Sequence, residues 1–365
     1  MNQYILILIW ILIMGIFYGT RRTNDIENTG SDVISPPSIL FCVCLVAPLV
    51  FSAAFRTTFG DQGYKIAFRA ASVSFSDLVS TIQSGAKGPG YYVIQYIGGL
   101  LFGNDAEVFF FVIASLQMIS LVRLYRKYSS DLWIGMFIFV ASTDYLSWMQ
   151  NGIRQFIAVT LILFFSDYIF EKKYIRICII ILIAATIHSS AWIMLPIVFV
   201  VQGEAFNKKT ILSILGMVVV LAMLDRFVPA LDQILSDTEY SNAITDWQQS
   251  GNDGVNIFRV LVYSMPTIIS LLGIRVIKES GDNVINITCN MGIISTLLYV
   301  LAMYTSGIYV GRLPIYCSLY SNGILLPWLI RRIFNRESSR ILIMIMIIAY
   351  IGFYYYQTHY IWGII

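Results

Sequence analysis

The fold is decided by an apolar stretch in the middle of the chain, residues 175–201, which reads IRICIIILIAATIHSSAWIMLPIVFVV. A single helix needs only about 20 apolar residues to cross a bilayer, so this stretch is too long for one span. It is interrupted at His188, and lysine pairs flank it at 172–173 and 208–209. Lysines favour the cytoplasmic side, so both flanks should lie on the same side. We therefore predict two short helices, about 175–187 and 190–201, which meet at His188 below the outer membrane surface.

The composition extends this interpretation to the whole chain of 365 residues. Hydrophobic residues make up 58% and charged residues 12%, and the mean hydropathy is +0.74. The apolar runs are continuous rather than alternating, which favours membrane helices over a barrel. The prediction is an all-α, polytopic transmembrane helical bundle of about 10–13 membrane segments, forming one integral membrane domain over residues 1–365. Spans are expected near 3–19, 38–55, 106–122, 131–149, 151–170, 210–228, 257–275, 285–304, 309–330 and 341–361.

The distribution of basic residues sets the expected topology. Clusters around 21–22, 123–127, 172–176, 208–209, 275–278 and 331–340 should be cytoplasmic. This arrangement leaves the N-terminus outside and makes 56–88 and 229–256 external loops. The apolar piece 89–103 then lies on the outer leaflet or dips into it. In the alternative arrangement it crosses the membrane, and the first two spans are inverted.

A polar cluster lies between two apolar runs, Tyr145-Leu146-Ser147-Trp148-Met149-Gln150-Asn151-Gly152-Ile153-Arg154-Gln155. The predicted topology brings four arginines to the external ends of spans, and these are Arg56, Arg154, Arg259 and Arg312. His188, Asp61 and Tyr64 fall on the same side. Guanidinium groups suit bidentate binding of phosphate, and a helix start such as that at Arg154 also favours an anion. Each arginine could instead reach lipid headgroups, His188 could be a packing residue, and Asp61 could be a turn residue.

The sequence contains no motif that would indicate nucleotide or metal binding. The chain has no phosphate-binding loop, no Gly-rich dinucleotide turn and no paired aspartates for a metal, and its two histidines, His188 and His359, are far apart. Its five cysteines lie in or beside apolar runs without metal-ligand spacing. We therefore expect no metal, no cofactor and no nucleic-acid partner.

Several motifs resemble those of the EpsG/Wzy-type bacterial polysaccharide polymerases, in order and spacing from about residue 50 to 330. They are Phe55-Arg56 with Asp61 and Tyr64, Gly88-Pro89-Gly90-Tyr91-Tyr92, Asn151-Gly152-Ile153-Arg154-Gln155-Phe156-Ile157-Ala158, Ile187-His188-Ser189-Ser190-Ala191, and Gly311-Arg312-Leu313-Pro314-Ile315-Tyr316. The resemblance implies a multi-pass enzyme of the bacterial cytoplasmic (inner) membrane. Such enzymes join oligosaccharide repeat units linked to undecaprenyl diphosphate on the outer face, and their partners include a chain-length regulator and a flippase.

The resemblance and the residues together suggest roles. Arg154 and Arg312, with His188 or Asp61 as the base, are expected to be catalytic in a metal-independent glycosyl transfer that releases undecaprenyl diphosphate. Substrate-binding roles are expected for Arg56, Tyr64, Asn151, Gln155 and Arg259.

Three competing functions use similar architecture. A flippase or transporter of lipid-linked glycans would hold the diphosphate without breaking a bond, but the internal repeats common in transporters are not visible. An O-antigen ligase or another outer-face glycosyltransferase would need the same leaving-group chemistry. A membrane O-acyltransferase would require a histidine facing an acyl donor.

Overall fold

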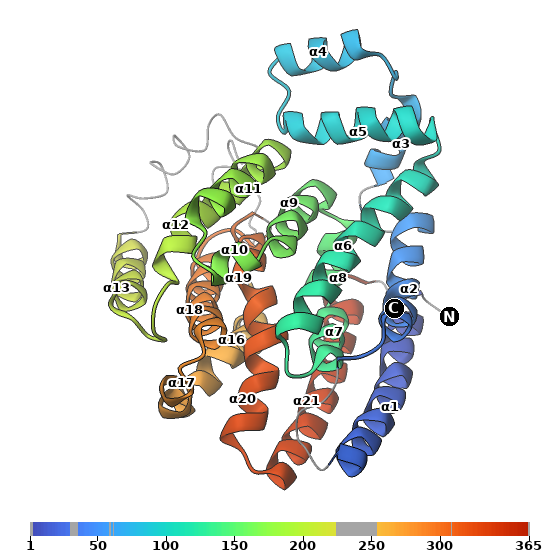
Figure 1. Ribbon diagram of the computed structural model, residues 1–365. Coiled ribbons are helices and arrows are strands. Elements are labelled where there is room, and N and C mark those ends of the chain that lie inside the picture. Colours follow the sequence, from blue (N-terminus) through green and yellow to red (C-terminus); the bar gives the residue numbers. More distant parts are fainter. Residues whose placement is uncertain are drawn as a thin grey trace.

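The computed structural model of the chain describes residues 3–29, 36–57, 60, 62–223, 254–307 and 309–363, and every regular element in these ranges is helical (Figure 1). The α-helices are α1 Gln3–Thr29, α2 Ile39–Phe55, α3 Gln62–Ala70, α4 Phe75–Gln83, α5 Pro89–Phe102, α6 Ala106–Tyr128, α7 Leu132–Ala141, α8 Asp144–Gln150, α9 Ile153–Phe164, α10 Asp167–Phe170, α11 Tyr174–Ile187, α12 Met194–Val200, α13 Lys208–Ala222, α16 Ile257–Leu272, α17 Ile274–Ser280, α18 Asn283–Met303, α19 Ile315–Tyr320, α20 Leu326–Ile333 and α21 Arg336–Tyr356. Shorter 3₁₀ segments are η1 Ser189–Ile193 and η2 Val310–Arg312, and π-helical segments are η3 Ser321–Leu325 and η4 Gln357–Ile361. This is the all-α bundle that the sequence predicts.

The described apolar helices fall into three groups by length and shape. Five are long and apolar enough to cross a membrane, and two bent pairs, α7 with α8 and α16 with α17, would each add one. Four shorter apolar helical stretches, α2, α9, α11 and the η1–α12 stretch, accompany them. The five to seven candidate spans, with these shorter stretches, form the polytopic bundle that the sequence predicts.

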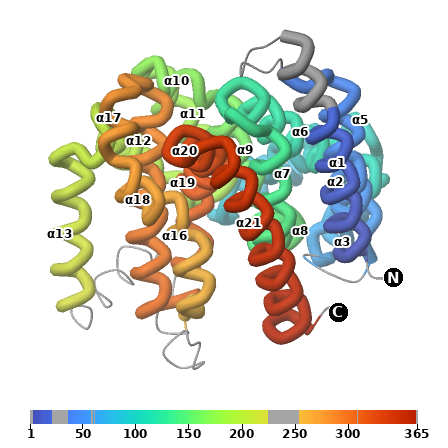
Figure 2. The backbone as a smooth tube through the Cα atoms, turned by 90° about the horizontal axis from the view of Figure 1, so that it is seen from below, coloured from blue at the N-terminus to red at the C-terminus, as the bar shows by residue number. Residues whose placement is uncertain are grey.

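Burial separates central from peripheral helices. All ten residues of α7 are buried, and 89% of the most apolar window of Val310–Ile333 is buried. A helix that is apolar on every side belongs in the interior of a bundle. The corresponding share is 33% in α1 and 28% in α21, so these helices leave most of their apolar surface for lipid. Figure 2 shows α13 at one edge of the molecule and α1 and α2 at the other, with α7 and α9 between them.

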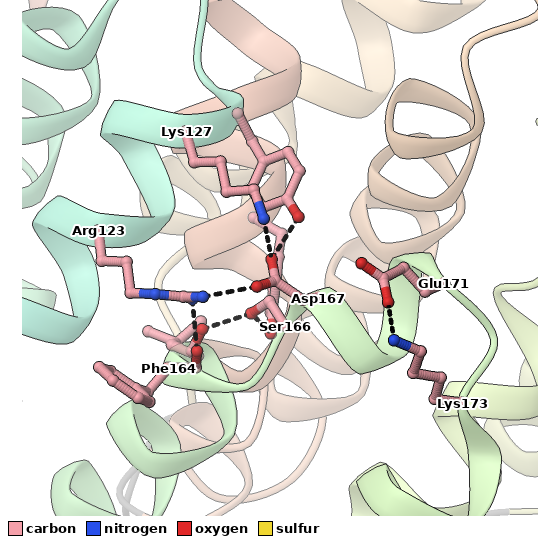
Figure 3. A network of polar contacts seen from close by, with 10 residues as sticks. Arg123, Lys127, Phe164, Ser166, Asp167, Glu171 and Lys173 are labelled. Carbon is pink, nitrogen blue, oxygen red and sulfur yellow. Dashed lines mark hydrogen bonds and ion pairs between the residues drawn. The ribbon is translucent and has the colours of Figure 1, made fainter. Parts of the chain in front are cut away.

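One end of the bundle, which we call the basic end, is joined by ion pairs of the residues predicted to be cytoplasmic (Figure 3). Asp167, at the start of α10, pairs with Arg123 at 2.5 Å and with Lys127 at 2.9 Å, and Tyr128 donates a hydrogen bond to the same carboxylate. Arg123 also donates to the Phe164 carbonyl at 2.6 Å. These contacts fix the end of α6 against the turn between α9 and α11.

Further contacts attach α2 to α6 and α20 to α7 at the basic end. Arg126 donates to the Pro37 carbonyl at 2.9 Å, which attaches the start of α2 to α6. Arg331 in α20 pairs with Asp131, whose side chain also caps α7 by accepting from the Ile134 N–H at 3.1 Å. The basic clusters of α6 and α20, which the sequence predicts to lie on the same side of the membrane, therefore lie at the same end of the bundle.

The predicted hairpin is present. Helix α11 ends at Ile187, His188 breaks the helical conformation, and η1 and α12 lead back. Tyr174 at the start of α11 stacks on Phe199 near the end of α12, with ring centroids 5.2 Å apart. Gln202 donates to the Ile169 carbonyl at 3.0 Å, so the two open ends of the hairpin meet at the side of α10.

The opposite end of the bundle carries α3, α4 and α5 (Figure 1). We call it the site end and define it by Gln150, Arg154, His188, Arg259 and Arg312. Helix α5 lies across this end, as the favoured arrangement predicts: its start approaches the hairpin, since a Cβ on Gly90 would meet Thr186 Oγ1 at 2.3 Å. Its end at Phe102 precedes α6, which runs to the basic end.

Several predicted spans differ in detail from the structure. The span 131–149 is broken between α7 and α8, which are bent by 73°, and the span 257–275 is broken between α16 and α17 by the same angle. The span 151–170 is a helix only as far as Phe164, followed by the turn of α10. The predicted external loop 56–88 contains α3 and α4. Most of the span 210–228 lies in α13, which ends at Ala222, whereas residues 224–228 and most of the loop 229–256 lie outside the described residues.

The Asp167 cluster predicts a pH-dependent stability. Asp167 lies between α9 and α11, outside the spanning helices. Burial by itself would raise the pKa of Asp167, but hydrogen bonds from Tyr128, Lys127 and Arg123 outweigh it and lower the pKa to about 2. The Asp167→Asn variant should lose about 1–3 kcal/mol of unfolding free energy at neutral pH. Because the ionised carboxylate stabilises the fold fully above its ordinary pKa of 3.8, the difference should shrink as the pH falls towards 2.

Thermal unfolding in detergent at several pH values measures this difference. Glu171→Gln is the matched control, since Glu171 forms an ion pair with Lys173 in which both side chains are nearly half exposed. Such a pair contributes about 0–1 kcal/mol. Equal losses for the two variants would contradict the assignment.

Candidate functional site

The break between α7 and α8 places polar backbone inside the bundle. Helix α7 has ten residues and is about 15 Å long, half the thickness of a hydrocarbon core. The chain then turns at Thr143, whose φ of 68° lies in the left-handed region that side chains disfavour. Neighbouring groups satisfy the Ser142 carbonyl at this helix end, which accepts from the Tyr263 hydroxyl at 2.7 Å and from Thr143 Oγ1 at 2.6 Å. Tertiary contacts therefore maintain this turn.

An ion pair follows the break. Asp144 begins α8 and is 2% exposed, and its Oδ2 accepts from Arg259 Nη2 at 2.7 Å and Nε at 3.1 Å. Arg259, which the sequence predicts to bind substrate, is thus engaged by a carboxylate from another helix. Sequence reasoning missed Asp144, although an acidic residue within the apolar run 131–149 was a usable signal.

Gln150, at the end of α8, connects three helices. Its Oε1 accepts from the Tyr4 hydroxyl of α1 at 2.5 Å, and its Nε2 donates to Ser52 Oγ of α2 at 3.2 Å. Its carbonyl accepts from Arg56 Nη2 at 2.9 Å. These bonds also place the start of α1 at the site end, as the predicted topology requires. Sequence reasoning did not identify Gln150 as a structural residue.

Arg56 is buried, at 3% exposure, and its guanidinium also donates to the Ala53 carbonyl. Lys65 of α3 donates to the carbonyls of Ala54 and Arg56, the latter at 3.0 Å. Burial and then the charge of Arg56 lower the pKa of the Lys65 ammonium, and Glu107 acts in the opposite sense. Two cations thus bind the carbonyls at the end of α2, so Arg56 has a visible positioning role.

The turn from α8 into α9 depends on Gly152. Its φ of 131° is accessible to glycine but rarely to other residues. Helix α9 begins without a side-chain cap at Gly152, whereas Asp105, Asn207 and Asp282 cap the first turns of α6, α13 and α18. The start of α9 carries the positive end of a helix dipole.

Arg312 lies against this helix start. A Cβ on Gly152 would be in van der Waals contact with Arg312 Nη1, at 3.4 Å, so the guanidinium lies directly beside this glycine. Gln155 Nε2 donates to the Arg312 carbonyl at 3.3 Å, which couples η2 to α9. Among the residues that the structure describes, none forms a hydrogen bond or ion pair with the Arg312 guanidinium. Its positive charge is therefore not neutralised by a described carboxylate.

Arg154 is held by neutral groups of α3 and of the connection to α5. Its Nε donates to the Tyr64 hydroxyl at 2.8 Å and its Nη1 to the Lys87 carbonyl at 2.9 Å. The guanidinium carbon lies 5.8 Å from the Tyr64 ring centroid and 6.0 Å from that of Tyr91. The structure thus joins Tyr64 and Arg154, two predicted site residues that are distant in sequence, and adds Tyr91, which was not predicted.

His188 lies half-buried at the tip of the hairpin. Its Nδ1 is 2.8 Å from Ser190 Oγ, which is 2.9 Å from the Tyr316 hydroxyl. Tyr316 follows Arg312 by one helical turn, so the histidine and the arginine attach to the same segment. Ser190 and Tyr316 occur in the motifs quoted above but were not assigned roles from the sequence.

For two other predicted site residues, Asn151 and Asp61, the structure shows little or nothing of how their side chains are placed. Asn151 ends α8 as its C-cap, with its backbone N–H donating to the Ser147 carbonyl at 2.6 Å. Asp61 lies outside the described residues. Within the described ranges, no group of three His, Cys, Asp or Glu side chains gathers as a metal site would require.

These features define a polytopic helical membrane protein with arginines around a helix start at one end of the bundle. A sequence model of the EpsG family matches residues 39–363, and the chain belongs to this family. The resemblance inferred from the motifs is thereby confirmed. No curated protein and no solved structure matches the chain significantly. Family membership indicates a polysaccharide-polymerase-like enzyme that acts in a membrane on lipid-linked oligosaccharide.

The Asp144–Arg259 pair predicts strong coupling in a double-mutant cycle. Removing one partner leaves an uncompensated charge in the bundle, so Asp144→Ala should cost about 3–5 kcal/mol of stability. The Asp144→Ala/Arg259→Ala double variant should be more stable than the sum of the single losses indicates. Unfolding of the purified variants in detergent tests this, and additive losses would show that the pair is not coupled.

Proposed function

We propose that the chain is a bacterial inner-membrane polysaccharide polymerase, which joins undecaprenyl-diphosphate-linked oligosaccharide repeat units at the outer face. The observation that carries the proposal is the position of Arg312 against the start of α9. A guanidinium beside the positive end of a helix dipole suits an anion such as a diphosphate. Arg154, one residue into α9, adds a second guanidinium.

The proposed orientation rests on the charges at the two ends. The basic end carries Arg126, Lys127, Arg331 and their neighbours, and short connections rich in lysine and arginine stay in the cytoplasm. The site end then faces outward. Helices α9 and α11 have 12 and 14 residues, about 18 and 21 Å, so both are shorter than the hydrocarbon core. Backbone that ends at such a depth suits a polar recess open to the outside.

The chemistry proposed for this recess is glycosyl transfer. An acceptor sugar hydroxyl attacks the anomeric carbon of the donor chain, and the bond between that carbon and the phosphate oxygen breaks. Undecaprenyl diphosphate leaves with the bonding electrons, and Arg312 and Arg154 stabilise the charge that develops on it. In this proposal the arginines, rather than a metal ion, take the charge. Asn151 and Gln155 position the turn, while Arg56 and Arg259 hold α8.

A base must accept the proton of the attacking hydroxyl. His188 is one candidate: its Nδ1, which accepts from the Ser190 backbone N–H at 3.3 Å and lies 2.8 Å from Ser190 Oγ, carries the lone pair of the neutral imidazole. Asp61 is the alternative base. Both lie in the motifs shared with the family.

The arginines supply the main test. Arg312→Ala and Arg154→Ala should abolish long polymer while single repeat units still reach the final acceptor, as gels of surface polysaccharide from a complemented deletion strain would show. Lysine at either position should also work poorly, because a point charge does not reproduce the guanidinium fork. Arg275→Ala, an exposed arginine in α17 paired with Glu279, is the matched control and should retain polymer.

Other gel patterns would favour another function. Accumulation of lipid-linked units that have not been translocated would indicate a flippase. Loss of even the single-unit product, with polymer remaining on the lipid carrier, would indicate a ligase. Normal polymer in both alanine variants would contradict the proposed site.

The choice of base is tested by turnover of lipid-linked units by the purified enzyme. If His188 is the base, His188→Ala should lower kcat by about 10²–10⁴-fold. Ser190→Ala removes the contacts of Ser190 Oγ with His188 and Tyr316, and the loss of the one to His188, about 1 kcal/mol, should lower kcat by only about five-fold. A larger loss in Asp61→Asn than in His188→Ala would transfer the role to Asp61.

A further inference from the structure

A cleft lies between α4 and α5 at the site end, on a different face of α5 from Arg154. Its lining includes Asp77 and Thr81 of α4, Tyr92, Gln95 and Tyr96 of α5, and Asn104 beyond α5. Gly99 lets these elements approach, because a Cβ there would lie 2.9 Å from Val73 Cγ2. None of the roles proposed above uses this cleft.

The side chains that line the cleft exclude two kinds of ligand. Asp77 is the one charged residue among those lining it in the described part of the chain, and no lysine or arginine accompanies it. A phosphate would meet a carboxylate there without a cation, which is unfavourable. An acyl chain would displace water from the Asp77 carboxylate and the Gln95 amide without replacing its hydrogen bonds, which is also costly.

The remaining chemistry suits sugars. Tyr92 and Tyr96 are half-buried in the lining, and Tyr96 lies beside Phe75, with ring centroids 6.2 Å apart. Aromatic rings offer flat apolar faces, while carboxylate and amide groups accept and donate hydrogen bonds to hydroxyls. A few polar groups placed among apolar walls are typical of small-ligand sites.

Helix α5 connects this cleft to the arginine site. Tyr91 lies beside Arg154, whereas Tyr92 and Tyr96 line the cleft. Tyr96 follows Tyr91 by five positions along the helix, which corresponds to a rise of about 7.5 Å. A glycan whose diphosphate end lies at the arginines could therefore have neighbouring sugars within reach of the cleft.

We propose that the cleft between α4 and α5 is a saccharide subsite, which binds uncharged or amino sugars of the oligosaccharide being joined. The proposal rests on the proposed function, since the glycan is that of the polymerase. It adds that sugars and diphosphate are bound on two faces of one helix. Binding at the cleft then depends on the sugar and not on the lipid diphosphate.

Binding of a glycan without lipid or phosphate tests the subsite directly. The probe is the oligosaccharide released by partial acid hydrolysis of the parent strain's surface polysaccharide, titrated against the purified chain in nanodiscs by saturation-transfer NMR. Tyr96→Ala should weaken binding about ten-fold, the equivalent of a lost aromatic contact, and Tyr96→Phe should restore it. Asp77→Asn, an exposed change that leaves the helix intact, should also weaken binding. Tyr360→Ala, a 67% exposed tyrosine beyond α21, is the control and should bind as the parent does.

The outcomes separate this proposal from the polymerase assignment. Arg312→Ala should bind the probe normally, because the subsite makes no phosphate contact. If the parent fails to bind, or if Tyr96→Ala and Asp77→Asn bind unchanged, the subsite is wrong even when Arg312→Ala abolishes polymer. If Arg312→Ala makes normal polymer, the proposed arginine site fails while the binding result still decides the subsite. In turnover assays, Tyr96→Ala should raise the KM for the donor more than it lowers kcat.

Discussion

The rest of the structure depends on satisfying backbone groups where helices end inside the bundle. Helix α7 ends at Ala141, α9 begins at Ile153 and α11 ends at Ile187, and none is long enough for a full crossing. In hydrocarbon such ends would leave polar groups without partners, at a cost of several kcal/mol each. The chain meets this cost with side chains from distant segments: Tyr263 for the Ser142 carbonyl, Arg56 for Gln150 and Gln155 for Arg312. The same requirement gathers polar side chains at one depth, where a site can form.

The sequence predicts the hairpin and the grouping of motifs well, because both follow from local signals. His188-Ser189-Ser190 is a polar interruption in an apolar run, and the flanking lysines require the chain to return. The position of α5 across the site end also agrees with the arrangement that the basic residues favour. Charge and hydropathy act along the chain, so a single sequence contains this information.

The break at Thr143 and the partners of the arginines could not be predicted in the same way. No proline or glycine marks the turn between α7 and α8, and its left-handed Thr143 is maintained by contacts with α16. The partners Asp144 and Arg259 are 115 positions apart, and Arg56 reaches Gln150 across 94 positions. Such pairings depend on which helices pack together, and hydropathy does not determine that.

The charge of an arginine's partner separates a structural from a functional role in this bundle. Arg259 and Arg331 each face an aspartate, so an incoming diphosphate would have to displace a carboxylate and leave it unpaired. That exchange is unfavourable inside a bundle, where an isolated charge is costly. Arg312 faces a glycine and a helix start, and no described group would have to be displaced for it to bind an anion. All three arginines look alike in the sequence, at the ends of apolar runs, and only their partners distinguish them. The proposed diphosphate site therefore follows from where the aspartates are, as much as from where the arginines are.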